Sequence, residues 1–313
     1  MAGARPALAQ TSSKTFRLAT LSPAAPIGEK SPFGTMLLKG LEQRGYGLGK
    51  NLTFDARGVM GQIGKLPETV RALKRDGADV VVVIGYPTAL ACKVENVPTV
   101  VAFGAGDPVT THLVDGLARP GGSITGISDD AVALSGKRLD LIKQAVPTLR
   151  RVAMLWNRDD LGMSQRYEVS ASSARSIGAS VQALGLREPD DFNGVFETMN
   201  REPPDAILLV ADSLTSLNRK RVYDYAAERH IPALYEYDFL VRDGGLMSYG
   251  PDLKESFERV ADMVARIFNG AKPADLPFEQ PIRYPFVVNL KTAKATGIEL
   301  PPQFVALADE VIE

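Results

Sequence analysis

The chain of 313 residues has few of the side chains that usually carry covalent or metal chemistry. Its one cysteine, Cys92, excludes an intrachain disulfide, and its helical surroundings predict a small buried side chain rather than a reactive thiol. The two histidines, His112 and His230, stand in no metal-ligand spacing, and His230 ends a predicted helix. We therefore expect no metal site.

The sequence also lacks an excess of charge and long apolar runs. It has 36 basic and 37 acidic residues, and this balance gives no electrostatic case for nucleic acid or an anionic membrane as a partner. No run approaches the roughly 18 apolar residues of a membrane span. A nucleophile elbow and a phosphate-loop lysine are absent, and Gly104-Ala-Gly106 lacks the third glycine of a dinucleotide fingerprint. No cofactor is expected.

What the chain does contain is a strand–helix–strand unit that occurs twice. The first copy runs from Asp79 to Phe103, and the second runs from Asp205 to Tyr235. Each copy has an apolar strand, a short polar loop, a helical stretch and a second strand entered through a proline. The loops are predicted at 86–88 and 213–215. Two copies indicate two similar lobes, and a cleft between lobes is a common site for a small ligand.

The pattern over the whole chain predicts an α/β fold of two Rossmann-like, three-layer α/β/α lobes. The length favours two domains, and the alternation of strands and helices favours mainly parallel sheets. We expect the turn-rich stretches 119–126 and 244–250 and the extended segment 277–288 to join the lobes. Glycines 121, 122, 244, 245 and 250 are candidates for hinge positions, or for ordinary tight turns. One strongly amphipathic helix is predicted from Leu253, Phe257, Val260, Ala261, Val264 and Phe268.

The N-terminus carries a pattern typical of export. Ala7-Leu8-Ala9 is followed by polar residues through Lys14, as at the cleavage end of a secretory signal peptide. The charged start and apolar stretch that should precede it are missing. We interpret residues 1–14 as a disordered remnant of a truncated signal peptide, and we expect a periplasmic protein.

The candidate ligand site consists of the residues that follow the strands, because ligands of open α/β sheets bind beyond the carboxyl ends of strands. Serine and threonine hydroxyls and helix-start N–H groups suit a carboxylate, and Asp212 or Glu236 suits an ammonium group. Tyrosines and Phe103 suit an apolar or aromatic group. Local roles as helix caps or packing residues remain open for each of them. The predicted ligand-binding residues are Ser22, Tyr86, Thr88, Phe103, Gly104, Asp107, Asn157, Asp212, Ser213, Tyr235, Glu236 and Ser248.

Several long motifs occur in the order found in one known family. The chain resembles the ABC-transporter substrate-binding proteins of the tryptophan-binding-like group, which have a type I periplasmic-binding fold. The motifs are Gly106–Val109, Leu117–Gly126, Lys137–Leu141, Gly244–Gly250, Lys272–Pro281, Val288–Gly297 and Ala308–Glu313. The stretch Ser128–Leu134 departs from the family, where more hydroxyl and aromatic residues are common.

The resemblance implies two lobes joined by three crossovers that act as a hinge, with an amino acid, possibly aromatic, or a similar small carboxylate held between them. We expect an N-terminal lobe of residues 15–125 plus 251–284, and a C-terminal lobe of residues 126–250 plus 285–313. The implied partners are a small solute and the membrane permease of an ABC importer, and we expect a monomer. Two alternatives remain at this point: a two-lobed enzyme using Asp107, Asp212 and Glu236, and the ligand-sensing domain of a signalling system.

Overall fold

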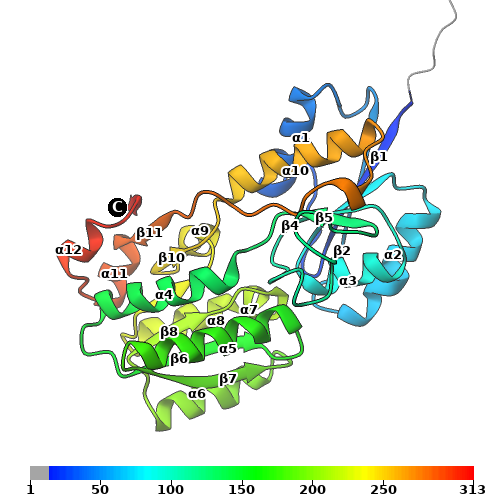
Figure 1. The fold of residues 1–313 in the computed structure, drawn as a ribbon. Helices are drawn as coiled ribbons and strands as arrows, with labels where there is room; N and C mark the ends of the chain where they lie inside the picture. Colours follow the sequence, from blue (N-terminus) through cyan, green and yellow to red (C-terminus); the bar gives the residue numbers. More distant parts are fainter. Residues whose placement is uncertain (1–13) are drawn as a thin grey trace, which may run out of the picture.

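The computed structural model describes residues 14–313, and they form two α/β lobes (Figure 1). The predicted signal-peptide remnant falls almost wholly on residues 1–13 and lies outside the described residues. Within residues 14–313, the strands form one sheet in each lobe. None of the helices in this range is long and apolar enough to cross a membrane.

The first lobe is built on a parallel sheet with strand order β2-β1-β3-β4-β5. Its strands are β1 (Phe16–Ser22), β2 (Leu52–Gly58), β3 (Val80–Ile84), β4 (Thr99–Phe103) and β5 (Ile124–Gly126). Its helices are α1 (Pro32–Gln43), η1 (Ile63–Lys65), α2 (Leu66–Arg75), α3 (Tyr86–Val94), α10 (Leu253–Phe268) and η2 (Pro273–Asp275). The last two return from the far end of the sequence, as Figure 1 shows in orange.

The second lobe is built on a sheet with strand order β12-β11-β10-β9-β8-β6-β7, in which β10 and β11 pair antiparallel and the other neighbours pair parallel. Its strands are β6 (Arg151–Asn157), β7 (Ser180–Leu186), β8 (Ala206–Leu209), β9 (Ala233–Tyr235), β10 (Met247–Tyr249), β11 (Phe286–Asn289) and β12 (Glu310–Ile312). Its helices are α4 (Ala131–Ala145), α5 (Leu161–Ser176), α6 (Asp191–Arg201), α7 (Ser213–Leu217), α8 (Arg219–Glu228), α9 (Asp238–Arg242), α11 (Leu290–Thr296) and α12 (Pro302–Val305).

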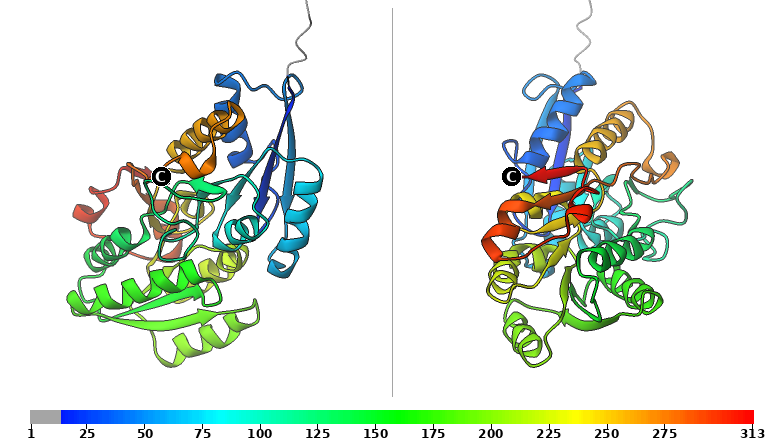
Figure 2. Two further views of the ribbon diagram at one scale, coloured as in Figure 1. Left: turned by 45° about the vertical axis from the view of Figure 1, so that its right-hand side comes forward. Right: turned by 90° about the vertical axis from the view of Figure 1, so that its left-hand side faces the viewer.

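The two copies of the repeated unit occupy equivalent places in the two sheets. The order β2-β1-β3-β4-β5 of the first sheet corresponds to β7-β6-β8-β9-β10 of the second. The units β3-α3-β4 and β8-α7-α8-β9 therefore have matching neighbours. In each sheet the second strand pairs on one side of the first strand and the third strand pairs on its other side. Ligands of doubly wound sheets bind at this switch point. Figure 2 shows the two lobes from two further sides.

Two local predictions were wrong. The stretches 86–88 and 213–215 are the first turns of α3 and α7 rather than loops. Pro87 stands at the start of α3, where its missing N–H costs nothing. The Asp212 side chain accepts a hydrogen bond from the backbone N–H of Thr215 and closes a capping box, so α7 begins directly after β8. Both helix starts are thereby brought to the end of a strand.

The three stretches predicted to join the lobes each lie partly in strands. Ile124–Gly126 is the edge strand of the first sheet, and Met247–Tyr249 lies inside the second sheet, because their backbones pair with neighbouring strands. The chain passes between the lobes at 127–130, 250–252 and 276–285. Gly250 is needed there for close packing, since a Cβ on it would lie 1.8 Å from the carbonyl oxygen of Glu236.

The amphipathic helix α10 packs on α1 as part of the first lobe. All six of the apolar positions predicted for it are buried. The two helices approach closely at Gly40, where an added Cβ would lie 2.7 Å from the Cβ of Ala261. In the same lobe the α3 residue Cys92 is buried. Burial raises the pKa of its thiol to about 12, which makes the thiol unreactive.

Candidate ligand-binding site

A cavity of about 450 Å³ lies between the lobes, at the carboxyl ends of strands from both sheets. From the first lobe it is lined by residues after β1, β3 and β4 and by the start of α1. From the second lobe it is lined by residues after β6, β8 and β9. The volume lies in the range of about 300 to 1,000 Å³ that small-molecule sites occupy in proteins.

Aromatic rings from both lobes form one part of the cavity wall. Phe33 and Phe103 come from the first lobe, and Tyr237 and Phe239 come from the second. The ring centroids of Phe103 and Tyr237 are 5.2 Å apart, and those of Phe33 and Phe239 are 5.8 Å apart, both edge to face. Edge-to-face packing exposes ring faces and edges that suit a further aromatic group.

Two carboxylates of the second lobe, Asp160 and Asp212, also line the cavity. Asp160 is the N-cap of α5, where its Oδ1 accepts a hydrogen bond from the N–H of Met163 at 3.2 Å. Asp212 Oδ1 accepts hydrogen bonds from the N–H and hydroxyl of Thr215. Asp212 Oδ2 is shielded from solvent and has no hydrogen-bond partner among residues 14–313. Both acids thus lie in the cavity wall, and Asp160 is 3% exposed.

The electrostatics of this pair favour a cation. Burial, and after it the negative charge of Asp212, raises the pKa of Asp160 to about 7 from an ordinary value of 3.8. Burial also raises the pKa of Asp212, although the hydrogen bonds from Thr215 and the nearby Asn157 amide lower it in part. The guanidinium of Arg219 lines the cavity too, but its Nε lies 2.6 Å from Asp243 Oδ2 in an ion pair. A positively charged ligand group would relieve the repulsion between the two acids.

Hydroxyl groups and one helix start also line the cavity. Ser22, Ser31 and Ser213 line it, as do Gly85 and Pro87 at the start of α3. In the described chain no side chain caps α3, so the N–H groups of its first turn are free of a capping acceptor. Such groups bind carboxylates and other anions.

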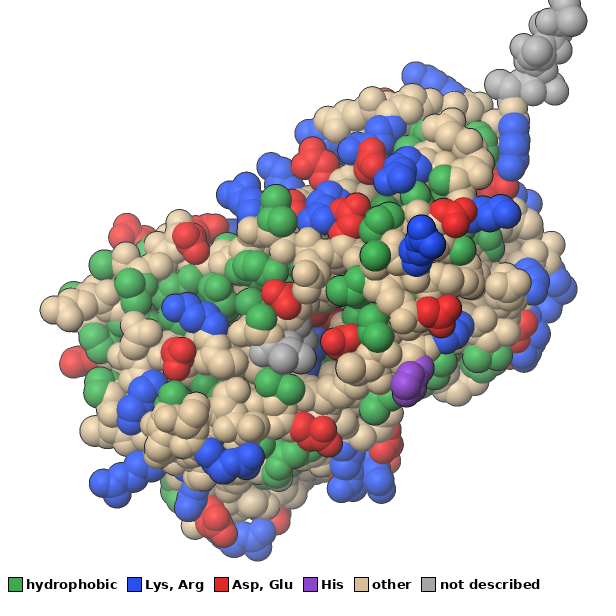
Figure 3. Space-filling view, in the orientation of Figure 1, with side chains coloured by type: hydrophobic (Ala, Val, Ile, Leu, Met, Phe, Trp, Pro, Cys, Tyr) green, Lys and Arg blue, Asp and Glu red, His purple; other side chains and the backbone are tan. Residues whose placement is uncertain are grey.

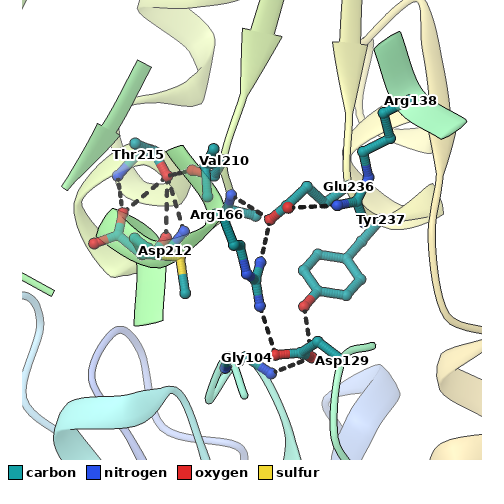
Figure 4. Close-up of polar contacts among 12 residues, drawn as sticks. Gly104, Asp129, Arg138, Arg166, Val210, Asp212, Thr215, Glu236 and Tyr237 are labelled. Carbon is teal, nitrogen blue, oxygen red and sulfur yellow. Dashed lines mark hydrogen bonds and ion pairs between the residues drawn. The ribbon is translucent and has the colours of Figure 1, made fainter. Parts of the chain in front are cut away.

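Behind the aromatic wall lies a buried cluster of charged side chains (Figure 4). Arg166 donates to Asp129 Oδ2 and to Glu236 Oε2, each at 2.5 Å, and Arg138 donates to Glu236 Oε1 at 2.8 Å. Burial alone would lower the pKa of Arg166, but the charges of Glu236 and Asp129 outweigh it and raise that pKa. The hydroxyl of Tyr237 donates to Asp129 Oδ1 at 3.1 Å. The cluster thus pairs its buried acids with buried bases.

Five of the predicted ligand-binding residues line the cavity. They are Ser22, Phe103, Gly104, Asp212 and Ser213. Gly104 has a φ of 81°, and an added Cβ would lie 3.1 Å from the backbone N of Gly85, so a glycine is required where the loops after β3 and β4 meet. The strand-end rule therefore brings these residues together as expected, from both lobes.

Two further predicted residues lie close behind the cavity wall. Asn157 lowers the pKa of Asp212 from nearby, and its Oδ1 accepts from the N–H of Asp159. Tyr86 lies near Asp160, whose charge adds to the effect of burial in raising the pKa of the Tyr86 phenol. Neither side chain lines the cavity itself.

The other predicted residues do not line the cavity, and all of them except Ser248 have local partners. Thr88 donates to the carbonyl of Gly85 at 2.8 Å, and Asp107 Oδ1 accepts from the N–H of Val109 at 2.9 Å. Tyr235 is buried edge to face against Tyr223, and Ser248 is buried in β10. Both carboxylate oxygens of Glu236 are taken by arginines. Of the two acids predicted for an ammonium group, Asp212 alone lines the cavity.

The sequence reasoning missed several residues that line the cavity, namely Ser31, Phe33, Asp160, Ser216, Arg219, Tyr237 and Phe239. Asp160, Tyr237 and Phe239 lie two to four residues beyond a strand end, so a longer window after each strand would have included them. Phe33 belongs to the first turn of α1, after a long connection from β1, and nothing in the spacing marks it. Within residues 14–313, no group of three or more His, Cys, Asp or Glu is placed to hold a metal ion.

The surface agrees with the charge balance of the sequence. On the face shown in Figure 3, acidic and basic side chains are interspersed over both lobes rather than gathered by sign. That distribution gives no basic surface for nucleic acid on this face.

Comparison with known proteins agrees with this architecture. The family described as ABC transporter substrate binding protein matches residues 34–312. A tyrosine-binding protein from Clostridioides difficile (strain R20291) is 22% identical over 264 residues, which cover 84% of this chain and 75% of that protein. The crystal structure of a conserved domain protein from Vibrio cholerae superposes with a TM-score of 0.87 at 25% identity, covering 95% of this chain and 100% of that one.

A second similar structure is a complex with a ligand. It is the ABC domain in complex with L-Trp from Streptococcus pneumoniae, with a TM-score of 0.84, 23% identity, and coverage of 96% of this chain and 100% of that one. These matches confirm the predicted two-lobed type I periplasmic-binding fold and the resemblance stated from the motifs. They also place the chain among solute-binding proteins rather than enzymes. The chain belongs to the family of ABC transporter substrate-binding proteins.

Proposed function

We propose that this protein is the periplasmic solute-binding component of an ABC importer and that its solute is an aromatic amino acid. The ammonium group of the solute binds between Asp160 and Asp212, and its ring lies among Phe33, Phe103 and Phe239. The relatives described as tyrosine-binding and as an L-Trp complex support an amino acid of this class.

The observation that carries the proposal is that two acids, Asp160 and Asp212, line the same cavity as four aromatic rings. Two carboxylates close together in a buried site repel each other, and burial together with the charge of Asp212 raises the pKa of Asp160. An ammonium group donates three hydrogen bonds and cancels charge, so it satisfies both acids at once. The carboxylate of the amino acid then faces the hydroxyl of Ser22 and the uncapped start of α3.

In this proposal the two lobes close on the solute. The division into residues 15–125 plus 251–284 and 126–250 plus 285–313 places the cavity between them, with the passages at 127–130, 250–252 and 276–285 as the hinge. A ligand that contacts both lobes favours the closed arrangement by its differential affinity. The closed, loaded monomer delivers the solute to the membrane permease.

Calorimetric titration of the purified protein at pH 8 tests the ligand class. L-tryptophan, L-tyrosine, tryptamine and indole-3-propionate separate the contributions of the ring, the ammonium and the carboxylate. We expect the two amino acids to bind and indole-3-propionate, which lacks the ammonium group, to fail. Tryptamine is expected to bind more weakly than tryptophan, because it lacks the carboxylate.

The proposal is wrong if neither amino acid binds, or if indole-3-propionate binds as tightly as tryptophan. A thermal-shift screen gives an independent reading, because a ligand at a hundredfold its dissociation constant stabilises the native state by about 2.7 kcal/mol. Small-angle scattering with and without the bound amino acid tests closure, which predicts a smaller radius of gyration in the complex.

A further inference from the structure

Asp129 joins the two lobes directly behind the cavity. It lies in the passage between β5 and α4, and its side chain is 2% exposed. Its Oδ1 accepts from the N–H of Gly104 at 2.7 Å and from the hydroxyl of Tyr237 at 3.1 Å. Its Oδ2 accepts from the N–H of Gly106 at 2.9 Å and from Arg166 at 2.5 Å. Each oxygen therefore joins one backbone donor of the first lobe to one side chain of the second.

Two of the four donors also form the cavity wall. Gly104 lines the cavity from the first lobe, and Tyr237 lines it from the second. In Figure 4 the hydroxyl of Tyr237 points at Asp129, and this contact fixes how its ring is turned. The ring then packs edge to face on Phe103 and nearly parallel to Phe239 at 5.8 Å. Asp129 thus fixes the position of the Tyr237 ring relative to the backbone of Gly104 in the other lobe.

The charges of the cluster make this contact depend on the relative position of the lobes. Arg166 and Arg138 face Asp129 and Glu236, and all four side chains are buried. Glu236, Arg138 and Arg166 belong to the second lobe, while both backbone donors to Asp129 belong to the first. If the lobes separate, Asp129 keeps its partners on one side only, and either Arg166 or the carboxylate loses a buried charged partner. Such a loss is costly in a buried site.

We infer that Asp129 is a positioning residue for ligand binding, which holds the Tyr237 wall against the Gly104 wall and favours the closed arrangement of the lobes. This inference rests on the proposed function for its ligand, but its effect on the lobes does not depend on which ligand binds. Asp129 does not line the cavity, and it acts through the residues that do.

The test compares Asp129→Asn and Tyr237→Phe with Asp224→Asn as the matched control. Asp129→Asn keeps the shape and removes the charge, and Tyr237→Phe removes only the hydroxyl that reaches Asp129. Asp224 lies on α8 of the second lobe, where its side chain is 66% exposed and pairs with Lys220 of the same helix. Surface plasmon resonance with L-tryptophan and L-tyrosine gives association and dissociation rates, and small-angle scattering of the ligand-free proteins gives the radius of gyration.

Loss of a buried charged partner acts mainly on dissociation. We expect Asp129→Asn to raise the dissociation rate at least about tenfold and Tyr237→Phe about threefold, with association changed less than about twofold in both. Asp224→Asn is expected to match the wild type. Without ligand, Asp129→Asn is expected to have a larger radius of gyration than the wild type, because the link that favours closure is weakened.

Wild-type dissociation rates in both variants, or equal effects of Asp129→Asn and Asp224→Asn, would overturn the inference. If Asp129→Asn does not fold, Tyr237→Phe decides, because it leaves every charge of the cluster in place. If the wild type binds neither amino acid, the proposed function fails, and the ligand-free scattering decides the inference. An unchanged radius of gyration in Asp129→Asn would then overturn it.

Discussion

Phe103 and Tyr237 meet edge to face across the boundary between the lobes, with ring centroids 5.2 Å apart and planes at 63°. Phe103 ends β4 of the first sheet, and Tyr237 follows β9, which has the equivalent place in the second sheet. The contact therefore joins corresponding ends of the two repeated units. It forms the part of the cavity wall where an aromatic ligand would touch both lobes.

The first prediction concerns Asp160 and Asp212, the two acids that line the cavity. Asp212→Asn removes one charge of the proposed ammonium site, and we expect binding of L-tryptophan or L-tyrosine to weaken at least about 30-fold, which corresponds to about 2 kcal/mol. Asp160→Asn should act in the same direction. Asp159→Asn is the matched control, because Asp159 is exposed and pairs with Arg187. Calorimetric titration at pH 8 measures all three, and equal affinities of Asp212→Asn and Asp159→Asn would contradict the proposed ammonium site.

Binding should depend on pH through Asp160. The pKa of its carboxyl in the ligand-free protein is about 7, so below pH 7 the proton must leave before an ammonium group can bind. We expect affinity to be constant above about pH 8 and to fall by up to about tenfold for each pH unit below 7. The Asp160→Asn variant should lose this slope. Titrations between pH 5 and pH 8.5 measure it, and a flat wild-type profile would exclude this role.

The same carboxyl should make the ligand-free protein less stable as the pH rises. Its pKa is raised in the folded state from an ordinary value of 3.8 to about 7. Between these values the folded protein holds a proton that the unfolded chain has released. The contribution of Asp160 to the free energy of unfolding is therefore present below about pH 4 and lost as the pH rises to 7. Urea unfolding at pH 5 and pH 7.5 should show a smaller pH effect in Asp160→Asn than in the wild type.

The aromatic wall should select the ring of the ligand. Phe239→Leu keeps an apolar side chain but removes a ring that contacts Phe33 and Tyr237. We expect L-tryptophan to bind about threefold to tenfold more weakly, in line with about 0.5 to 1.5 kcal/mol for an aromatic pair. Phe196→Leu is the control, since Phe196 packs on Phe192 and Tyr225, away from the cavity. Similar losses in both variants would point to a general loss of stability instead.

Close packing of α1 on α10 should make Gly40 sensitive to a single methyl group. Alanine is the better helix former, yet its Cβ would lie 2.7 Å from the Cβ of Ala261. We expect Gly40→Ala to lower the free energy of unfolding by about 1 to 3 kcal/mol, and Ala261→Gly in the same chain to recover part of it. Gly64→Ala is the control, because an added Cβ there meets open space. Denaturant unfolding measures all of these variants, and a neutral Gly40→Ala would show that the helices can move apart freely.

Much of the fold could be predicted from local patterns. The six apolar positions of α10 are spaced for one helix face, and all are buried. The two strand–helix–strand units are found where their apolar runs and prolines indicated, and they occupy matching places in the two sheets. Periodicity determines which face of an element is apolar, so these features depend on few residues at a time.

The candidate site was predictable only in part. Asp212 and Glu236 both follow strands of the second lobe and both looked suited to an ammonium group. Asp212 reaches the cavity, whereas Glu236 pairs with Arg138 and Arg166. Those arginines are 98 and 70 residues away along the chain, so no local pattern reveals the pairing. Asp160 was not predicted from the sequence; it is the N-cap of α5, and it is buried near enough to Asp212 for that charge to raise its pKa.

The sequence by itself determined the two repeated α/β units, the amphipathic helix and the lack of a second cysteine for an intrachain disulfide. These follow from composition and from spacings within one element. The tertiary structure alone decided which strand-end residues face a common cavity, which acids are neutralised by arginines and how Asp129 connects the lobes. The reason is physical: burial and charge pairing depend on groups brought together from distant parts of the chain, and the energy of each carboxylate is set by those neighbours.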